Sequence, residues 1–433
     1  MAEPNQASFF VHEEGSVRDV AVKVVEEQEE DNSFFICDLF ELKNMLELWH
    51  QQLPKVTPYF AIKSCSDRIV IRTLAMEGVN FDCSNKREIQ AVLSAGVDSS
   101  RIIYANPAKQ SSHLDFAESS GVTLMTFDCL EELQKIMDKN ARLLLRFSAQ
   151  AGDHEDRMAR KYGCSILEAE HILRVATDQG HTVVGIAFHI GGRHFSIESY
   201  RSAIEKARRL FDIGAQMGIK MTVLDIGGGF VGSTRRRDLF IQVCETVRSA
   251  LDEHFPSTGG IHVIAEPGQY MVTSSFTLAV KVVAKRTRQT NVDGEFIPYH
   301  DVYINDSKQN CIPRENYEGL CIKYHPLSPP LERPCNQITT LWGATCHPMD
   351  KFEDHVPFFE VSVGEWLLMD NVGAYGLVKA CGFNGTGFPP VHYRTSAEDA
   401  ARVCSIIEES QLLPGYSQPQ SLLRVGTRTE QQL

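Results

Sequence analysis

Between Pro58 and Gly268 the chain repeats one pattern eight times: a short apolar, β-prone run ends at a polar residue or a glycine. The runs are "YFAIK", "VNFDCS", "RIIYAN", "TLMTFD", "LLLRF", "VGIAFH", "VLDIGGG" and "HVIAEPG". Segments that can form helices lie between them, and near-continuous apolar runs are typical of parallel strands buried on both faces. Eight such units in about 210 residues predict a closed (β/α)8 barrel, with an open doubly wound sheet as the alternative.

The clearest helix is expected in "YRSAIEKARRLFDIGAQMG", which starts at Tyr200. The residues expected on its buried face are Ile204, Ala207, Phe211 and Ala215. Gly218 is placed to end the helix, because glycine readily takes the left-handed conformation found there.

After Gly268 the pattern changes to strand-like runs without intervening helices. These runs are "SFTLAVKVVAK", "DVYIN", "QITTLW", "FFEV" and "EWLLM". They predict a separate, largely antiparallel β domain, which the N-terminal "SFFICDL" is expected to join. The predicted divisions are an N-terminal segment packing with the β domain (1–40), the barrel (41–275), the β domain (276–410) and a polar, partly disordered tail (411–433).

Composition narrows the class of protein. The net charge of −13 argues against nucleic acid or an anionic membrane as the main partner, since both need a basic face. The N-terminus lacks the pattern of a signal peptide, and no run reaches the roughly 18 apolar residues of a membrane span. The 12 cysteines have no CxxC spacing, which suggests neither a metal site nor a disulfide framework. We therefore expect a cytoplasmic protein with reduced thiols and no metal.

In a barrel of this kind the chemistry lies at the C-terminal ends of the strands. Those ends carry Lys63, Asp82, Asn106, Asp128, Arg146, His189, Gly227 to Gly229, and Glu266. A lysine can form a Schiff base, a glycine run lets backbone N–H groups approach a phosphate, and a glutamate can pair with a pyridinium nitrogen. Each feature alone has an ordinary explanation, such as a tight turn or an exposed lysine. Their coincidence at successive strand ends predicts pyridoxal phosphate.

The stretch "LWGATCHPMD" places Cys346 directly beside His347. The pair could be a catalytic couple or half of a metal site, and Cys346 could equally be a small buried hydrophobe. Adjacency in sequence does not decide among these interpretations.

The chain resembles the eukaryotic ornithine decarboxylases, which are fold type III pyridoxal phosphate enzymes. The matching stretches are "PYFAIKSCSD", "GVNFDCSNKREIQ", "RIIYANPAKQ", "VTLMTFD", "FHIGG", "LDIGGGFVGS", "AEPGQYMV", "YINDS", "WGATC" and "DNVGAYG". They follow the family's order from about residue 30 to 395. The sequence is similar to a mammalian member of this family that acts as a leucine decarboxylase.

The resemblance implies a role for each matching position. Lys63 would hold the cofactor covalently, His189 would stack on its ring, and Glu266 would keep its ring nitrogen protonated. The remaining cofactor contacts implied are Asp82, Arg146, Gly227, Gly228, Gly229 and Tyr375. Cys346 would come from a neighbouring subunit and return a proton to Cα after CO₂ leaves, so the resemblance implies a homodimer with shared active sites.

Two departures from the family weaken the expected phosphate site. Gly192 stands where the family has a serine, and Gln269 stands where it has an arginine. Losing an arginine–phosphate contact removes a charge-assisted, bidentate interaction. Arg193 is a candidate to compensate.

A third departure affects the expected substrate. His347 occupies the position of an aspartate that receives the distal ammonium of ornithine, while Asp306 matches a second acid of that pocket. Phe383 is the third candidate pocket residue. Burying an ammonium without its carboxylate is unfavourable, so ornithine and lysine are expected to be poor substrates. A neutral aliphatic amino acid, best exemplified by leucine, fits the altered pocket.

The competing hypothesis is a catalytically impaired regulator like the family's antizyme inhibitors. The weakened phosphate site favours it, whereas the intact Asp82 and Cys346 oppose it. Asp115 and Asp138 stand where the family's antizyme-binding surface is basic, so antizyme binding is doubtful. An arginine decarboxylase-like activity would need an anionic pocket and is disfavoured together with ornithine.

Overall fold

The computed structural model describes residues 9–12, 15–149, 161–191, 196–256, 260–292, 294–313, 322–402 and 424–425. The chain forms two compact units. Residues 45–271 make up one unit, and residues 1–44 together with 272–433 make up the other.

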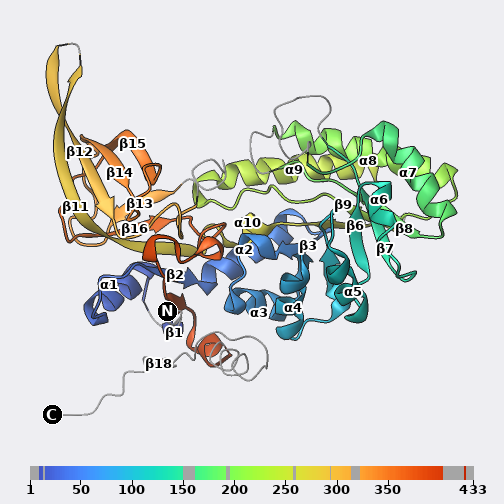
Figure 1. The fold of residues 1–433 in the computed structure, drawn as a ribbon, viewed down its shortest axis with the longest axis horizontal. Helices are drawn as coiled ribbons and strands as arrows, with labels where there is room; N and C mark the ends of the chain where they lie inside the picture. Colours follow the sequence, from blue (N-terminus) through green and yellow to red (C-terminus); the bar gives the residue numbers. More distant parts are fainter. Residues whose placement is uncertain are drawn as a thin grey trace. The chain divides into compact units, whose positions relative to one another are not determined.

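The unit of residues 45–271 is a closed barrel of eight parallel strands in the order β10-β3-β4-β5-β6-β7-β8-β9 (Figure 1). The strands are β3 (Val56–Ala61), β4 (Asn80–Cys83), β5 (Ile102–Tyr104), β6 (Leu124–Phe127), β7 (Arg142–Arg146), β8 (Thr182–Ala187), β9 (Val223–Asp225) and β10 (His262–Ala265). Pairing of β10 with β3 closes the ring, with Val263 opposite Val56. The predicted barrel is confirmed, and the open sheet is excluded.

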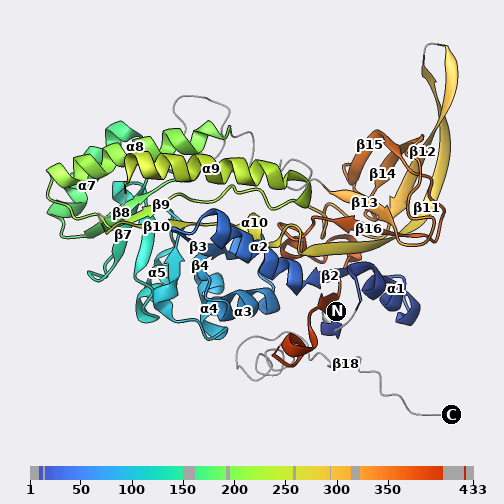
Figure 2. The same ribbon diagram turned by 180° about the vertical axis from the view of Figure 1, so that it is seen from behind.

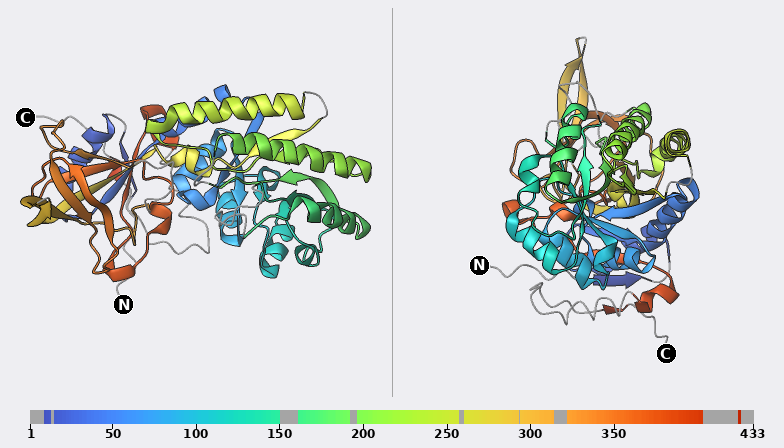
Figure 3. Two further views of the ribbon diagram at one scale, coloured as in Figure 1. Left: turned by 90° about the horizontal axis from the view of Figure 1, so that it is seen from above. Right: turned by 90° about the vertical axis from the view of Figure 1, so that its right-hand side faces the viewer.

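Helices surround the barrel strands, as the right panel of Figure 3 shows. They are α2 (Leu39–Gln52), α3 (Arg68–Met76), α4 (Lys86–Ser94), α5 (Ser111–Ser119), α6 (Leu130–Leu133), α7 (Ile166–Asp178), α8 (Glu198–Gln216), α9 (Arg237–His254) and α10 (Gly268–Val272). Helices α7, α8 and α9 lie side by side on the outside of the barrel (Figure 2).

Helix α8 follows the predicted pattern with one correction. Ile204, Ala207 and Phe211 are buried, and Gly218 ends the helix with φ +77°. Ala215 is exposed instead of buried. Gly214 is buried instead, and a Cβ atom there would meet the end of the Met221 side chain.

The barrel is filled by apolar side chains from successive strands. Residues of this core include Tyr59, Ile103, Ala105, Leu124, Leu144, Val184, Ala187, Val223 and Ile264. Such a filled interior leaves the C-terminal ends of the strands as the place where a ligand can bind.

The other unit is built on a ten-stranded sheet whose main path runs β15-β14-β12-β11-β2-β17-β1-β18, with β13 and β16 off this path. Its strands are β1 (Phe9–His12), β2 (Phe34–Asp38), β11 (Phe276–Val292), β12 (Glu295–Ile304), β13 (Lys323–Pro326), β14 (Gln337–Trp342), β15 (Lys351–Phe358), β16 (Trp366–Asp370), β17 (Val391–Arg394) and β18 (Arg424–Val425), and helix α1 (Val17–Glu27) also belongs to this unit. Strand β2 pairs antiparallel with β11 and parallel with β17, which ties the N-terminal segment into the sheet.

The sheet differs from the sequence prediction in two ways. The strand expected at "FFEV" (358–361) is not formed: only Phe358 belongs to a strand, as the last residue of β15. Strands β11 and β12 also continue into a long hairpin that reaches well beyond the neighbouring strands (Figure 1). Its register shifts between Val282 and Ala284, which marks a β-bulge.

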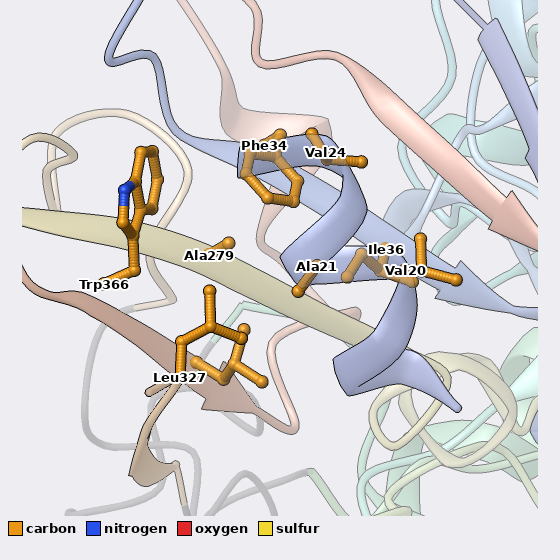
Figure 4. Packing of buried hydrophobic residues seen from close by; sticks show 9 residues of the cluster. Val20, Ala21, Val24, Phe34, Ile36, Ala279, Leu327 and Trp366 are labelled. Carbon is orange, nitrogen blue, oxygen red and sulfur yellow. The ribbon is translucent and has the colours of Figure 1, made fainter. Parts of the chain in front are cut away.

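A compact apolar cluster holds helix α1 on the sheet (Figure 4). The cluster comprises Val20, Ala21, Val24, Phe34, Ile36, Ala279, Leu327, Trp366 and Leu368. Phe34 and Trp366 pack at a ring-centroid distance of 5.7 Å. The amphipathic helix contributes one apolar face, and its N-terminus is closed by a capping box between Ser16 and Asp19.

Other expectations concern the chain as a whole. The cysteines of the described residues have free thiols. No helix in the described part of the chain combines the length and apolar character needed to cross a membrane. Apart from Arg424 and Val425, the tail predicted to be partly disordered lies outside the described residues.

Candidate active site

Lys63 and Asp82 form an ion pair at the C-terminal end of the barrel. Lys63 lies in a single 3-10 turn, Ile62–Ser64, directly after β3, and Asp82 lies in the neighbouring strand β4. Lys63 Nζ is 2.9 Å from Asp82 Oδ2. The side chain of Lys63 is 39% exposed whereas that of Asp82 is 1% exposed, so the amine can reach a ligand while the buried acid holds it.

Two further carboxyl groups, Asp225 and Glu266, lie at the ends of the adjacent strands β9 and β10. Burial raises the pKa of Asp225 to about 7, with Asp82 adding to the effect. Burial also raises the pKa of Glu266 well above its ordinary value, reinforced by Asp225 and then Asp82. Because the negative charge of one carboxyl group opposes ionisation of the other, the form with both ionised at once is disfavoured. The pair therefore holds a proton at neutral pH.

His189 follows β8 and is neutral. The backbone N–H of Gly191 donates to its Nδ1 at 2.8 Å, which places the hydrogen of the neutral ring on Nε2. Burial lowers the pKa of His189 well below its ordinary value, and the cations Arg146 and Lys63 lower it further. Arg146 ends β7, with its guanidinium 5.3 Å from the ring centroid of Tyr162.

The glycine run after β9 is required by close approach of backbone from neighbouring strands. Gly227 and Gly229 have φ of +66° and +101°, a region in which side chains are strained. A Cβ atom on Gly228 would lie 2.7 Å from the carbonyl oxygen of Glu266. The hydroxyl of Tyr200, fully buried, donates to the Gly228 carbonyl at 3.0 Å. The loop is thus fixed beside Glu266 and His189.

The positions that depart from the family lie near this loop. Gln269 is buried, and its amide donates to the carbonyl of Phe230 at 3.2 Å. It supplies no positive charge to a phosphate. Gly192 and Arg193 lie outside the described residues.

The barrel end fits pyridoxal phosphate. Lys63 offers an amine, the glycine loop offers backbone, and the buried acids offer negative charge for a protonated ring nitrogen. Buried oxygens of Asp82 (Oδ1) and Asp225 (Oδ2) have no hydrogen-bond partner among the described residues. Unpartnered buried acceptors are costly, and a cationic ligand group would satisfy them.

Cys346 and His347 lie on the turn between β14 and β15, in the other unit, and both are exposed. His347 Nδ1 accepts a hydrogen bond from the N–H of Met349 at 3.1 Å, so this nitrogen is engaged within its own turn. The imidazole also packs edge-on against Phe383, with centroids 6.4 Å apart. In the described part of the chain, no group of three or more His, Cys, Asp and Glu side chains could hold a metal ion.

Tyr375 lies in the loop after β16 in a strained backbone conformation. Its φ is +56°, which is uncommon for a bulky side chain. Gly373 in the same loop has no room for a Cβ atom because the carbonyl of Val272 occupies that space. Strain of this kind costs on the order of 1–3 kcal/mol and is concentrated at functional sites.

Asp306 is fully buried in the same unit as Cys346 and His347. Its Oδ2 accepts from Ser33 Oγ at 2.7 Å, and its Oδ1 accepts from the N–H of Ser307 at 2.6 Å. Burial raises the pKa of this carboxyl. The carboxyl group of Asp306 thus holds loops together inside the β unit, and the role of Asp306 in a substrate pocket stays a prediction.

Sequence reasoning missed two acids, Asp225 and Asp350. Asp225 precedes the glycine run, so the strand-end pattern could have identified it if the last residue of each strand had been counted. Asp350 is 1% exposed and binds several donors of the Cys346 turn. No local pattern signals it, because some of its partners lie on a loop about 40 residues away.

Comparison with known proteins gives consistent matches. Residues 39–273 match the family described as "Pyridoxal-dependent decarboxylase, pyridoxal binding domain". The chain is 36% identical over 388 residues to an ornithine decarboxylase from Rattus norvegicus, covering 87% of this chain and 84% of the relative. It is 35% identical over 401 residues to antizyme inhibitor 2 from Xenopus laevis, covering 90% and 87%.

Solved structures show the same fold. The arginine decarboxylase of Paramecium bursaria Chlorella virus, bound to agmatine, superposes with a TM-score of 0.79 at 28% sequence identity. The match covers 87% of this chain and 100% of the viral enzyme.

Proposed function

The chain belongs to the ornithine decarboxylase-like family of pyridoxal-dependent decarboxylases, and from this premise we propose that it decarboxylates a neutral aliphatic amino acid, with leucine as the best single candidate. Pyridoxal phosphate is the cofactor of this family, and Lys63, His189, Glu266 and the glycine loop after β9 are the residues proposed to hold it.

Each barrel residue has a distinct chemical task in this proposal. Pyridoxal phosphate, when bound, supplies the electron sink for the pair of electrons left at Cα when CO₂ departs. Lys63 offers the amine that anchors the ring, and Asp82 holds that amine at 2.9 Å. Glu266 and Asp225 would supply negative charge for a protonated ring nitrogen. The neutral imidazole of His189 can stack on a ring without adding positive charge.

Cys346 is proposed to return the proton to Cα. Its thiol is exposed on a turn whose backbone is fixed, with Cys346 N–H 3.4 Å from Asn384 Oδ1. The family resemblance implies that this cysteine would act at the active site of a second subunit. We therefore propose a homodimer with shared sites, which light scattering of the purified protein can test. We also propose that the protein is cytoplasmic.

Substrate choice rests on one observation: the acids near the Cys346 turn are sequestered, whereas His347 and Phe383 are exposed. Asp306 and Asp350 are both buried and bonded within their own unit. An ammonium at the end of a substrate side chain would meet an imidazole and a phenyl ring instead of a carboxylate. Discrimination against a substrate whose polar group lacks its partner can reach roughly 10⁴-fold.

The deciding experiment is to incubate the full chain and pyridoxal phosphate with carboxyl-labelled amino acids and count released CO₂. Release from leucine, with little from ornithine, lysine or arginine, supports the proposal. Release from ornithine at comparable rates would overturn the proposed selectivity while leaving decarboxylation intact.

A second candidate function, an antizyme-inhibitor-like regulator, is favoured by the uncharged Gln269 and by the similarity to antizyme inhibitor 2. No CO₂ from any amino acid, together with capture of antizyme in a pull-down, would establish it. The acidic Asp115 on α5 and Asp138 stand against antizyme binding.

A further inference from the structure

A single buried carboxylate organises the turn that carries Cys346 and His347. Asp350, the residue before β15, is 1% exposed. Its Oδ2 accepts hydrogen bonds from Thr345 Oγ1 at 2.6 Å, Thr345 N at 3.0 Å and Ser307 Oγ at 2.8 Å. Its Oδ1 accepts from the N–H of Lys308 at 3.0 Å. Four donors from two loops thus converge on one side chain.

The backbone of Asp350 closes the same turn. Its N–H donates to the carbonyl of His347 at 3.0 Å, and its carbonyl accepts from the N–H of Gly343 at 2.8 Å. Gly343 lacks a Cβ for a physical reason, because that atom would overlap the carboxylate of Asp350. The backbone of the turn is therefore packed closely against the carboxylate of Asp350.

Ser307 links this carboxylate to the neighbouring buried acid. Its hydroxyl donates to Asp350 and its N–H donates to Asp306 Oδ1 at 2.6 Å. The N–H of Ala344 also donates to the carbonyl of Asp306 at 2.9 Å. The turn of Cys346 and the loop after β12 are consequently one hydrogen-bonded assembly.

We propose that Asp350 is a positioning residue, which holds Cys346 and His347 in the geometry that the reaction and the side-chain pocket use. This inference rests on the proposed function of those two residues. A carboxylate suits this place because both of its oxygens accept: Oδ2 takes three of the bonds and Oδ1 takes the bond from Lys308 N–H. An amide has one accepting oxygen, so its N–H₂ group would face at least one of these donors. Removing the carboxylate leaves buried donors unpartnered.

The test measures the thiol of Cys346 directly in the full chain. Iodoacetamide alkylation is followed by mass spectrometry between pH 6 and pH 9, and the exposed Cys335 serves as the internal reference. In Asp350→Asn we expect Cys346 to react at least about threefold faster, because the turn that carries its thiol loosens when the hydrogen bonds to the carboxylate are lost. Cys335 should be unchanged.

Three further variants make the result decisive. Asp354→Asn removes the same charge from an exposed side chain in β15 and should leave Cys346 as in the wild type. Gly343→Ala removes no hydrogen bond but displaces the carboxylate, so it should reproduce the effect of Asp350→Asn. Ser307→Ala removes one of the four bonds to Asp350, together with the bond that Gln309 N–H donates to Ser307 Oγ, and should give a smaller change in the same direction. This variant keeps the test valid if Asp350→Asn fails to fold.

The inference would be overturned if Cys346 reacted at the same rate in Asp350→Asn as in Asp354→Asn across the pH range. If Asp350→Asn does not fold, Ser307→Ala takes its place in this comparison. The readout needs no turnover, so loss of the proposed decarboxylase activity and loss of the positioning role are separate outcomes. If leucine is a substrate, kcat should fall in Asp350→Asn more than KM rises, because proton return depends on the thiol position.

Discussion

Replacing Asp225 with asparagine should stabilise the cofactor-free protein at neutral pH. The pKa of Asp225 rises from 3.8 to about 7 on folding, chiefly through burial. Between these values the folded chain binds a proton that the unfolded chain does not, so the free energy of unfolding falls as pH rises from about 4 to about 7. Three pKa units correspond to about 4 kcal/mol, at roughly 1.36 kcal/mol per unit. Because Glu266 competes for the same proton, this value is an upper bound for Asp225 alone.

Asparagine keeps the geometry of the site while removing the titration. Its Oδ1 can still accept from the N–H of Gly227, as Asp225 Oδ1 does at 2.8 Å. Urea unfolding of the apoprotein at pH 5, 6, 7 and 8 measures the effect. We expect the wild type to lose stability across this range and Asp225→Asn to lose much less. Asp178→Asn, at an exposed position on α7, should follow the wild type. If the free energy of unfolding of Asp225→Asn fell with pH as steeply as that of the wild type, the proton bound on folding would not belong to Asp225 and the reasoning would be refuted.

Three other predictions concern the site and its frame. His347→Asp should raise kcat/KM for ornithine relative to leucine by about tenfold or more, because a carboxylate then meets the distal ammonium; an unchanged ratio would place the selectivity elsewhere. Lys63→Ala should abolish covalent retention of pyridoxal phosphate after borohydride reduction, read by intact mass, and retained adduct would show that another amine anchors the ring. Gly227→Ala should lower stability by at least about 2 kcal/mol, because φ is +66° and a Cβ atom would overlap the Phe188 carbonyl. Gly218 has a comparable φ of +77° and nothing within 4 Å of its Cβ position, so Gly218→Ala should lose only about 1 kcal/mol. Thermal unfolding of the two variants measures both losses.

Some of the barrel site could be predicted because it follows from local pattern. Each strand ends close to the end of its apolar run, and parallel strands bring those ends to one face of the barrel. Lys63 and Asp82 were expected at successive strand ends, and the structure pairs them at 2.9 Å. The proximity of Asp225 to Glu266 follows from the same rule, since Ile264 lies opposite Asp225 in the β9–β10 register.

The β unit shows where sequence reasoning stops. Asp306 matched a pocket acid by sequence, yet its carboxylate is buried and bound by Ser33, which is 273 residues away in the chain. Whether an acid faces a ligand or a buried hydroxyl depends on which loops pack against it. That outcome carries no local periodicity, so only the folded structure reveals it.

The sequence by itself determined the barrel, the lysine and glycine loop at its rim, and the replacement of an expected acid by His347, because spacing and residue type suffice for these conclusions. Tertiary structure alone decided three other features. It buried Asp225 beside Glu266 and so raised the pKa of both, it buried Asp306, and it gathered four donors around Asp350. Burial and long-range hydrogen bonding set the charge and availability of a carboxyl group, and both arise only when distant segments pack together.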